Sequence, residues 1–286
     1  FAVVIALHGF NDYSHAFAQP GLWLAGRGIA VYAYDQRGFG GTQQRGIWGG
    51  QENLTGDLRQ MVQAVRQQHP QEPLYLMGAS MGGAVTLAAL GTPSFPVEDI
   101  AGVILVAPAI WGADTRSLFY RLPLWVAAHT FPAAEFTGKD LGIQATDNVA
   151  VLREMADDPH IIRSTRADAV YGLTQLMDTA YAVVDKVALP VLILYGEKDE
   201  VIPLRPIHRV AERLMRDGTK QCRVVLYPDG YHMLLRDLQA EVVWRDIVNW
   251  ISQSPAVLPS GHEFHHTSPI FSDSAVSTGT DLEYSR

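Results

Sequence analysis

The sequence predicts an α/β protein in which helices cover both faces of a mostly parallel sheet. Short apolar runs of strand length recur along the chain, and amphipathic helical stretches separate them. The 286 residues, of which 48% are hydrophobic, are enough for one large domain or at most two small ones. The expected strands are Ala2–Leu7, Ile29–Tyr34, Leu74–Met77, Val103–Ala107, Val191–Tyr195 and Cys222–Tyr227.

The composition excludes several classes of protein. The chain carries 22 Lys and Arg against 30 Asp and Glu, a formal net charge of -8, so a basic face that binds nucleic acid is not expected. Cys222 is the only cysteine, which excludes an internal disulfide and a zinc site built from cysteines. No apolar run reaches the roughly 18–20 residues that a membrane-spanning helix needs, so no transmembrane segment is expected.

Two regions interrupt the alternation of strands and helices. Residues 112–186 show no convincing strand and are too long for an ordinary connection, so we predict a helical cap with helices around Val149–Met155 and Ala167–Val184. Residues 252–286 are rich in Ser, Pro, Thr, Gly and His without periodicity, a composition typical of disorder. The predicted organisation is core over 1–111, cap over 112–186, core over 187–251 and a disordered tail over 252–286.

Three histidines in the predicted tail resemble a metal cluster: His262, His265 and His266. No carboxylate or cysteine stands at ligand spacing beside them. Incidental histidines in a flexible tail are the favoured interpretation, and no metal is expected.

The segment Gly78-Ala79-Ser80-Met81-Gly82 follows an expected strand and precedes a helix of small residues. A serine on a sharp strand-to-helix turn needs glycine on both sides, because a side chain would clash where the backbone folds back. The hydroxyl is then held at the carboxyl edge of the sheet, near a helix N-terminus. This context favours Ser80 as a nucleophile over a glycine-rich turn with an incidental serine.

A serine hydroxyl needs an adjacent base to become nucleophilic. His232 follows the last strand, and Asp199 follows the strand before it, so the chain order is Ser, Asp, His. Glu197 and Asp229 compete for the role of the acid. We favour Asp199, because it stands one short turn beyond its strand, where the side chain can reach inward.

An oxyanion formed at this serine would need prearranged N–H donors. One is expected from the amide of Met81, directly after the nucleophile. The other is expected from the amide of Phe10, in the loop after the first strand. His8 in that loop could be taken for a base, but we favour a structural role, since the chain order assigns the base to His232.

Together these motifs resemble those of the α/β-hydrolases, in the group of monoacylglycerol lipases and lysophospholipases. The resemblance covers the core from Phe1 to about Ile251 and includes a cap where the family has one. It is specific for the fold and the triad, and less specific for the substrate. The matching segments are His8-Gly9-Phe10, Tyr34–Gly40, Gly78–Gly83, Gly196–Pro203 and Gly230-Tyr231-His232.

The resemblance implies an α/β-hydrolase fold and a serine carboxylic-ester hydrolase that forms an acyl-enzyme and needs no metal or organic cofactor. The expected partner is a small-molecule acyl ester, such as a monoacylglycerol or a lysophospholipid, which a lipid surface could present. We expect Phe119 and Trp125 in the cap to contact the acyl chain, although they could equally pack against the core. Other carboxylic esters stay open as substrates, amides rank below them, and a non-hydrolytic receptor is the alternative from another class.

The chain begins with Phe1, already inside an expected strand. We expect residues to precede it, because chain ends usually lie at the surface and the family has two more strands there. Without those strands, Ile29–Tyr34 would be an unprotected edge of the sheet. A signal or lipid-attachment site would lie there too, so the compartment stays open between the cytoplasm and an exported or lipid-anchored protein.

Overall fold

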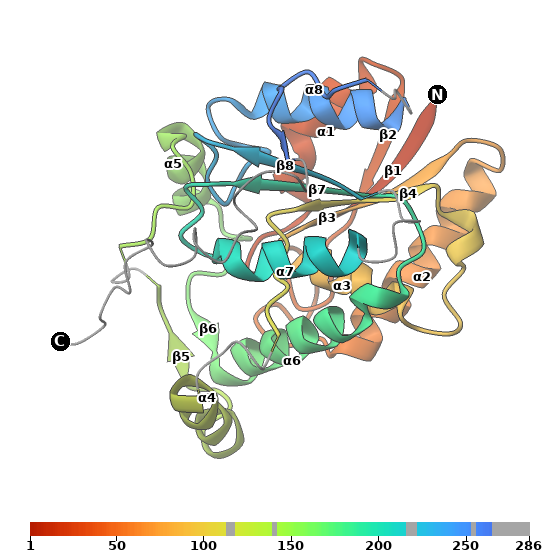
Figure 1. Ribbon diagram of the computed structural model, residues 1–286. Coiled ribbons are helices and arrows are strands. Elements are labelled where there is room, and N and C mark those ends of the chain that lie inside the picture. Colours follow the sequence, from red (N-terminus) through yellow and green to blue (C-terminus); the bar gives the residue numbers. More distant parts are fainter. Residues whose placement is uncertain (113–117, 139–141, 216–221, 253–255, 265–286) are drawn as a thin grey trace.

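A seven-stranded sheet crosses the middle of the molecule, with helices on both of its faces (Figure 1). The computed structural model describes residues 1–112, 118–138, 142–215, 222–252 and 256–264, and of residues 118–121 it describes the helix without the side chains. The strand order is β2-β1-β3-β4-β7-β8-β9, and every neighbouring pair is parallel except β8 and β9. These strands are β1 (Ala2–Leu7), β2 (Ile29–Ala33), β3 (Leu74–Ala79), β4 (Gly102–Val106), β7 (Val191–Gly196), β8 (Cys222–Tyr227) and β9 (Glu263–Phe264).

The predicted α/β class is confirmed, and all six predicted strands are present with ends that agree within about two residues. The alternation within β1 shows why the strands are continuous apolar runs. Val3, Ile5 and Leu7 belong to the core on one face of the sheet, whereas Ala2, Val4 and Ala6 belong to the core on the other. A strand that is covered on both faces has no polar side, so its residues are all apolar.

Two helical layers bury the sheet. Helices α1 and α8 lie on one face, and α2, α3 and α7 lie on the other, with α6 packed against α3 (Figure 1). No described helix is long and apolar enough to cross a membrane. The helices are α1 (Ala18–Ala25), α2 (Gln51–Gln68), α3 (Met81–Leu90), α4 (Leu118–Thr130), α5 (Val149–Asp157), α6 (Ala167–Val183), α7 (Leu204–Met215) and α8 (Ala240–Ile251), with short 3-10 helices at Ser14–Phe17, Val97–Asp99 and Val184–Lys186.

The insertion between β4 and β7 contains the predicted helices, as α5 and α6, and also α4. The prediction that it lacks strands is wrong, because β5 (Glu135–Phe136) and β6 (Thr165–Arg166) form a short antiparallel ladder. Each strand has only two residues, which is too short for an alternating pattern to be visible in the sequence. The ladder joins the segment after α4 to the start of α6.

Strand β2 is the outer strand of the sheet, as predicted for that apolar run. It pairs with β1 from Ile29 opposite Ala2 to Ala33 opposite Ala6. No strand pairs with its other side among the described residues. Four of its five residues are accordingly only partly buried, in contrast to the wholly buried β1.

The prediction of a disordered tail from residue 252 is wrong for residues 256–264. The backbone amide of Leu226 in β8 donates to the carbonyl of His262, and Glu263 forms an ion pair of 2.5 Å with Arg223. Leu258 is 1% exposed and belongs to the core beside α8. One buried leucine and one ladder suffice to order a segment whose composition is otherwise polar; residues 265–286 lie outside the described part.

Replacing Leu258 with alanine is expected to lower the free energy of unfolding by about 2 kcal/mol or more, because the change leaves a cavity in the core. The neighbouring variant Val257→Ala is the control, since Val257 is 64% exposed and should change stability by less than about 0.5 kcal/mol. Urea unfolding of both variants measures the difference. Equal values would mean that this segment does not pack on the sheet in solution.

Candidate active site

Ser80 stands at a sharp turn between β3 and α3. Its backbone has φ 50° and ψ -116°, a conformation that a residue with a side chain rarely adopts. Four backbone hydrogen bonds hold it there: the Ser80 amide donates to the carbonyl of Val106 (2.9 Å), and the Ser80 carbonyl accepts from the amides of Ala109 (2.9 Å), Gly83 (3.0 Å) and Ala84 (3.4 Å). The turn therefore presents the serine hydroxyl at the carboxyl edge of the sheet.

The two glycines of the motif are required by close backbone contacts. A side-chain carbon on Gly78 would come within 2.5 Å of the backbone of Gly82 and Gly83, and one on Gly82 would come within 2.1 Å of the carbonyl oxygen of Leu7. Real side chains do not tolerate either distance. The glycine spacing seen in the sequence is therefore explained by the close approach of α3 to β3 and to the end of β1.

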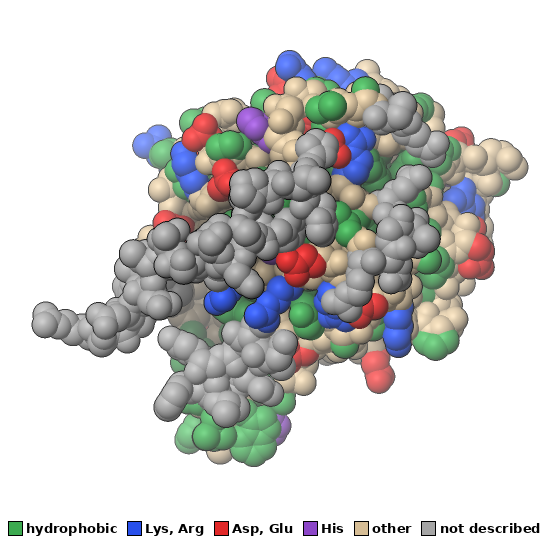
Figure 2. Space-filling view, in the orientation of Figure 1, with side chains coloured by type: hydrophobic (Ala, Val, Ile, Leu, Met, Phe, Trp, Pro, Cys, Tyr) green, Lys and Arg blue, Asp and Glu red, His purple; other side chains and the backbone are tan. Residues whose placement is uncertain are grey.

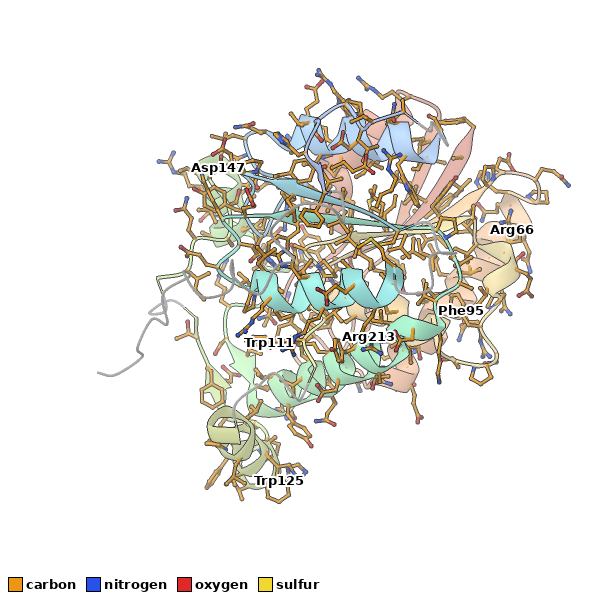
Figure 3. All side chains as sticks on the ribbon, in the orientation of Figure 1. Arg66, Phe95, Trp111, Trp125, Asp147 and Arg213 are labelled. Atoms are coloured by element: carbon orange, nitrogen blue, oxygen red, sulfur yellow. The ribbon has the colours of Figure 1, made fainter. Side chains whose placement is uncertain are left out.

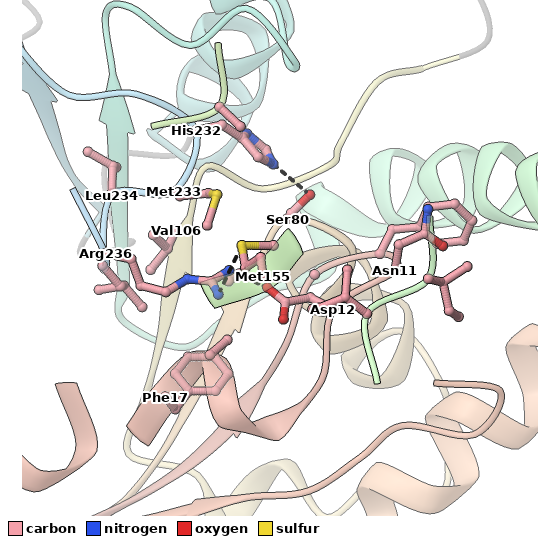
Figure 4. A pocket seen from close by; sticks show the side chains of 18 residues that line it. Asn11, Asp12, Phe17, Ser80, Val106, Met155, His232, Met233, Leu234 and Arg236 are labelled. Atoms are coloured by element: carbon pink, nitrogen blue, oxygen red, sulfur yellow. Dashed lines mark hydrogen bonds and ion pairs between the residues drawn. The ribbon is translucent and has the colours of Figure 1, made fainter. Parts of the chain in front are cut away.

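His232 links Ser80 to Asp199. Its Nε2 lies 3.1 Å from Ser80 Oγ, and its Nδ1 lies 2.8 Å from Asp199 Oδ2 (Figure 4 draws the contact with Ser80). A carboxylate only accepts hydrogen bonds, so the Nδ1–H donates to Asp199 and Nε2 is left to accept the Ser80 hydroxyl. The structure therefore brings together the three predicted residues, from three different loops at one edge of the sheet.

Asp199 is held more firmly than the competing acids. Its side chain is fully buried, and Oδ1 accepts from the amides of Val201 (2.7 Å) and Ile202 (3.0 Å). Asp229 forms an exposed ion pair with Lys198 (2.6 Å) instead. Glu197 is exposed, and no hydrogen bond or ion pair between it and His232 occurs in the described structure. Only Asp199 therefore orients the imidazole.

The loop after β1 lies directly over Ser80. A side-chain carbon on Gly9 would stand 3.3 Å from Ser80 Cβ, so the neighbouring amide of Phe10 is close to the nucleophile. Met81 begins α3, where the first amides have no partner within the helix. Within the described residues, neither the Phe10 nor the Met81 amide donates a hydrogen bond. Both amides are thus available to a ligand.

A cavity of about 260 Å³ opens beside Ser80 and His232 (Figure 4). Its walls come from the loop after β1, from the His232 loop and from the insertion, and apolar side chains predominate. The charged side chains among them are Asp12 and Arg236, which form an ion pair with each other. The lining residues are Gly9, Phe10, Asn11, Asp12, Ala16, Phe17, Ala79, Ser80, Val106, Ala145, Met155, Ile161, Ile162, His232, Met233, Leu234, Leu235 and Arg236.

A family model matches most of this chain. The model is that of Hydrolase_4, described as serine aminopeptidase, S33, and it matches residues 1–239. The chain belongs to the Hydrolase_4 family. It is an α/β-hydrolase, and the resemblance inferred from the motifs is confirmed.

Characterised relatives of this α/β-hydrolase carry lipase names. The monoacylglycerol lipase of Mycolicibacterium smegmatis is 26% identical over 267 residues, which cover 87% of each chain. The human monoglyceride lipase is 24% identical over 262 residues, which cover 89% of this chain and 84% of the relative.

Solved structures show the same fold. The monoacylglycerol lipase of Paleococcus ferrophilus superposes with a TM-score of 0.74 at 22% identity, covering 88% of this chain and 95% of the other. A soluble variant of the Saccharomyces cerevisiae monoglyceride lipase, solved with a substrate analogue, also gives 0.74, at 21% identity and with coverage of 88% and 86%. At these identities the likeness establishes the fold alone.

Of the two predicted cap residues of this hydrolase, the structure describes the side chain of Trp125. Trp125 lies on α4, away from the sheet (Figure 3), is 47% exposed, and stacks on His129 at 4.4 Å between ring centroids. It is absent from the described walls of this cavity, and its contact with an acyl chain stays a prediction. The side chain of Phe119 lies outside the described residues. Figure 2 shows hydrophobic side chains gathered at the same end of the molecule.

The motifs gave no sign of the ion pair between Asp12 and Arg236. It joins residues 224 positions apart, and Arg236 Nη1 also contacts Met155 Sδ (3.7 Å) in α5. A single aspartate and a single arginine carry no recognisable spacing, so only the fold reveals the pair. The pair connects the Phe10 loop to the His232 loop.

No group of His, Cys, Asp and Glu able to hold a metal ion occurs among the described residues. Of the three tail histidines, His262 packs edge-on against Tyr227, while His265 and His266 lie outside the described part.

His8 has a structural role in this hydrolase, as predicted. It is fully buried; its Nε2 accepts from the amide of Gln36 (3.0 Å), and its Nδ1 faces the carbonyl of Gly9 (2.8 Å). An imidazole that accepts at Nε2 is neutral, and burial lowers the pKa of His8 below its ordinary value of 6.5. The histidine therefore shapes the loop that carries Phe10.

This buried histidine should make folding stability depend on pH. Because the pKa of His8 is lowered in the folded chain, the unfolded chain binds a proton at this histidine below about pH 6.5 that the folded chain does not bind. The contribution of His8 to stability is therefore full above that pH and falls as the pH decreases. Urea unfolding at about pH 7.5 and about pH 5.5 measures the loss. The loss should shrink in His8→Gln, which can still accept from the Gln36 amide, but not in the exposed control His129→Gln. An unchanged loss in His8→Gln would contradict the assignment.

Proposed function

We propose that this α/β-hydrolase is a serine carboxylic-ester hydrolase that cleaves lipid-like acyl esters through an acyl-enzyme. The observation that carries the proposal is the position of the His232 imidazole, 3.1 Å from Ser80 Oγ and 2.8 Å from Asp199. A serine hydroxyl becomes nucleophilic when such an imidazole takes its proton. The strained turn and the buried acid support the same roles.

In the first half of the reaction, Ser80 Oγ attacks the ester carbonyl carbon while its proton moves to His232 Nε2. Asp199 accepts the Nδ1–H bond throughout and stabilises the imidazolium. The carbonyl oxygen becomes an oxyanion, to which the amides of Phe10 and Met81 donate. The imidazolium then gives its proton to the departing alcohol as the ester bond breaks, and the acyl group stays on Oγ.

In the second half, water takes the place of the alcohol. His232 removes a proton from the water as its oxygen attacks the acyl carbon, and the second tetrahedral intermediate uses the same two amides. Collapse of this intermediate returns the proton to Ser80 Oγ and releases the carboxylic acid. No step needs a metal or an organic cofactor.

The cavity supports an acyl ester of lipid character. Its walls are mainly apolar, which suits an acyl chain, and the relatives named above are a monoacylglycerol lipase and a monoglyceride lipase. A monoacylglycerol or a lysophospholipid is therefore the proposed substrate class, presented free or at a lipid surface. Esters with other alcohols are the second candidates, and the family description of a serine aminopeptidase makes amides a third class to assay.

The triad variants Ser80→Ala, His232→Ala and Asp199→Asn are each expected to lower kcat for p-nitrophenyl esters roughly a thousandfold or more, because each removes one part of proton transfer. Stopped assays over a series of ester concentrations give kcat and KM. Circular dichroism should show that the fold is kept.

Asp229→Asn is the matched control for Asp199→Asn, since Asp229 pairs with Lys198 on the surface. It should change kcat less than about threefold. Equal losses in both variants would overturn the acid assignment. A folded wild-type protein that neither hydrolyses esters nor reacts with a fluorophosphonate at Ser80 would instead indicate the non-hydrolytic receptor.

The cavity wall should set the preference for chain length. Met155 lines the cavity from α5, and Met155→Ala is expected to lower kcat/KM for octanoate esters about fivefold more than for acetate esters, since ~1 kcal/mol of apolar contact is lost only by the long chain. Leu152→Ala on the same helix is the control, because Leu152 is 41% exposed and outside the cavity wall. A uniform loss across chain lengths would assign Met155 to folding alone.

A further inference from the structure

A short stretch of the insertion binds the loop that carries His232. We call residues 144–148 the strap; they lie between Ile143 and α5. Figure 3 places Asp147 of the strap near the ends of β7 and β8, far from Trp125 on α4. Four hydrogen bonds join strap to loop: Met233 N to Ala145 O (2.9 Å), Thr146 Oγ1 to Asp237 Oδ1 (2.6 Å), Leu238 N to Asp147 Oδ1 (2.8 Å) and Asn148 Nδ2 to Arg236 O (2.9 Å).

The strap also reaches the loop that carries Asp199. The amide of Gln144 donates to Glu200 Oε2 (2.8 Å), and Glu200 directly follows the triad acid. One run of five residues is therefore bonded to both loops that supply the base and the acid. Bonds of this kind limit how far the two loops can move apart.

Asp237 is the buried centre of these contacts. It is 6% exposed; Oδ1 accepts from the Thr146 hydroxyl, and Oδ2 accepts from the backbone amide of Tyr231 (2.8 Å). Tyr231 directly precedes His232, so this bond fixes the backbone at the base of the triad. Burial raises the pKa of Asp237, because it removes water from around the charged form. The buried carboxylate is tolerated because both of its oxygens accept hydrogen bonds.

We propose that Asp237, held by Thr146 of the strap, is a positioning residue that fixes the His232 loop through its bond to the Tyr231 amide. This inference rests on the proposed function and assigns the insertion a part in it beyond covering the site. A group that holds the imidazole at 3.1 Å from Ser80 affects kcat, because small displacements interrupt proton transfer.

Other ionisable groups surround this loop, and the test must separate Asp237 from them. Two of the acids are paired with cations, and one is the triad acid itself. The groups are Asp199 and Glu200 from the loop after β7, Asp147 from the strap, Asp12 paired with Arg236, Asp229 paired with Lys198, and His262.

The first test removes the strap bond and keeps the charge. Thr146→Val keeps the shape of the side chain but cannot donate to Asp237, and it should lower kcat about tenfold with KM nearly unchanged. Thr146→Ser should restore kcat, since it can donate again. Thr179→Val, on α6 of the same insertion, is the matched control and should leave kcat within about twofold of wild type.

The second test removes the charge and keeps the shape. Asp237→Asn can still accept from the Tyr231 amide through its Oδ1. The neutral amide is a weaker acceptor than the carboxylate, so hydrogen exchange of the Tyr231 amide, followed by NMR, should become about tenfold faster and kcat should fall with KM nearly unchanged. Asp229→Asn is the matched control and should leave that exchange rate within about twofold of wild type.

Each outcome decides the proposal. An unchanged exchange rate of the Tyr231 amide in folded Asp237→Asn, or a Thr146→Val kcat equal to that of Thr179→Val, would overturn it. If Asp237→Asn does not fold, the Thr146 pair decides through kcat. If wild type hydrolyses no ester, the proposed function fails, while amide exchange needs no turnover and still decides the role of Asp237.

Discussion

The close packing of the Ser80 turn against the end of β1 is the constraint on which the rest of the site depends. Gly82 stands where any side chain would strike the carbonyl of Leu7, so α3 presses directly on β1. That contact brings Gly9 over Ser80 and with it the amide of Phe10. The positive φ of Ser80, which costs of order 1–3 kcal/mol, is compensated by bonds from Val106 and Ala109. The proposed nucleophile and the proposed oxyanion donors thus belong to one closely packed unit.

The base and the acid depend on a second, more polar arrangement. Burying the Asp199 carboxylate completely is unfavourable unless its oxygens are bonded, and the amides of Val201 and Ile202 together with the His232 ring provide those bonds. This is also why Asp229 does not take the same place: its side chain is exposed and pairs with Lys198. The turn after β7, rather than the presence of a carboxylate, selects the acid.

Patterns that act over a few residues could be predicted from the sequence, and contacts across the chain could not. The strand runs, the glycines around Ser80 and the order of Asp199 and His232 each express a local backbone requirement. The strap, by contrast, joins Thr146 to Asp237 across 91 positions through single polar residues with no characteristic spacing. The two-residue strands were missed because period-two alternation needs more residues. The exposure of Trp125 could not be predicted either, because apolar content alone does not say which surface a helix covers.

The insertion therefore consists of two parts with different relations to the triad. Helix α4 with Trp125 contributes no described side chain to the cavity wall and packs against α6 instead. The segment from the strap through α5 to Ile162 lines the cavity and is hydrogen-bonded to the His232 loop. A movement of this second segment would change the cavity wall and, at the same time, the hydrogen bonds that hold the His232 loop. On the proposed function, substrate fit and proton transfer are therefore coupled through the same few residues, which a roof that merely covered the site would not do.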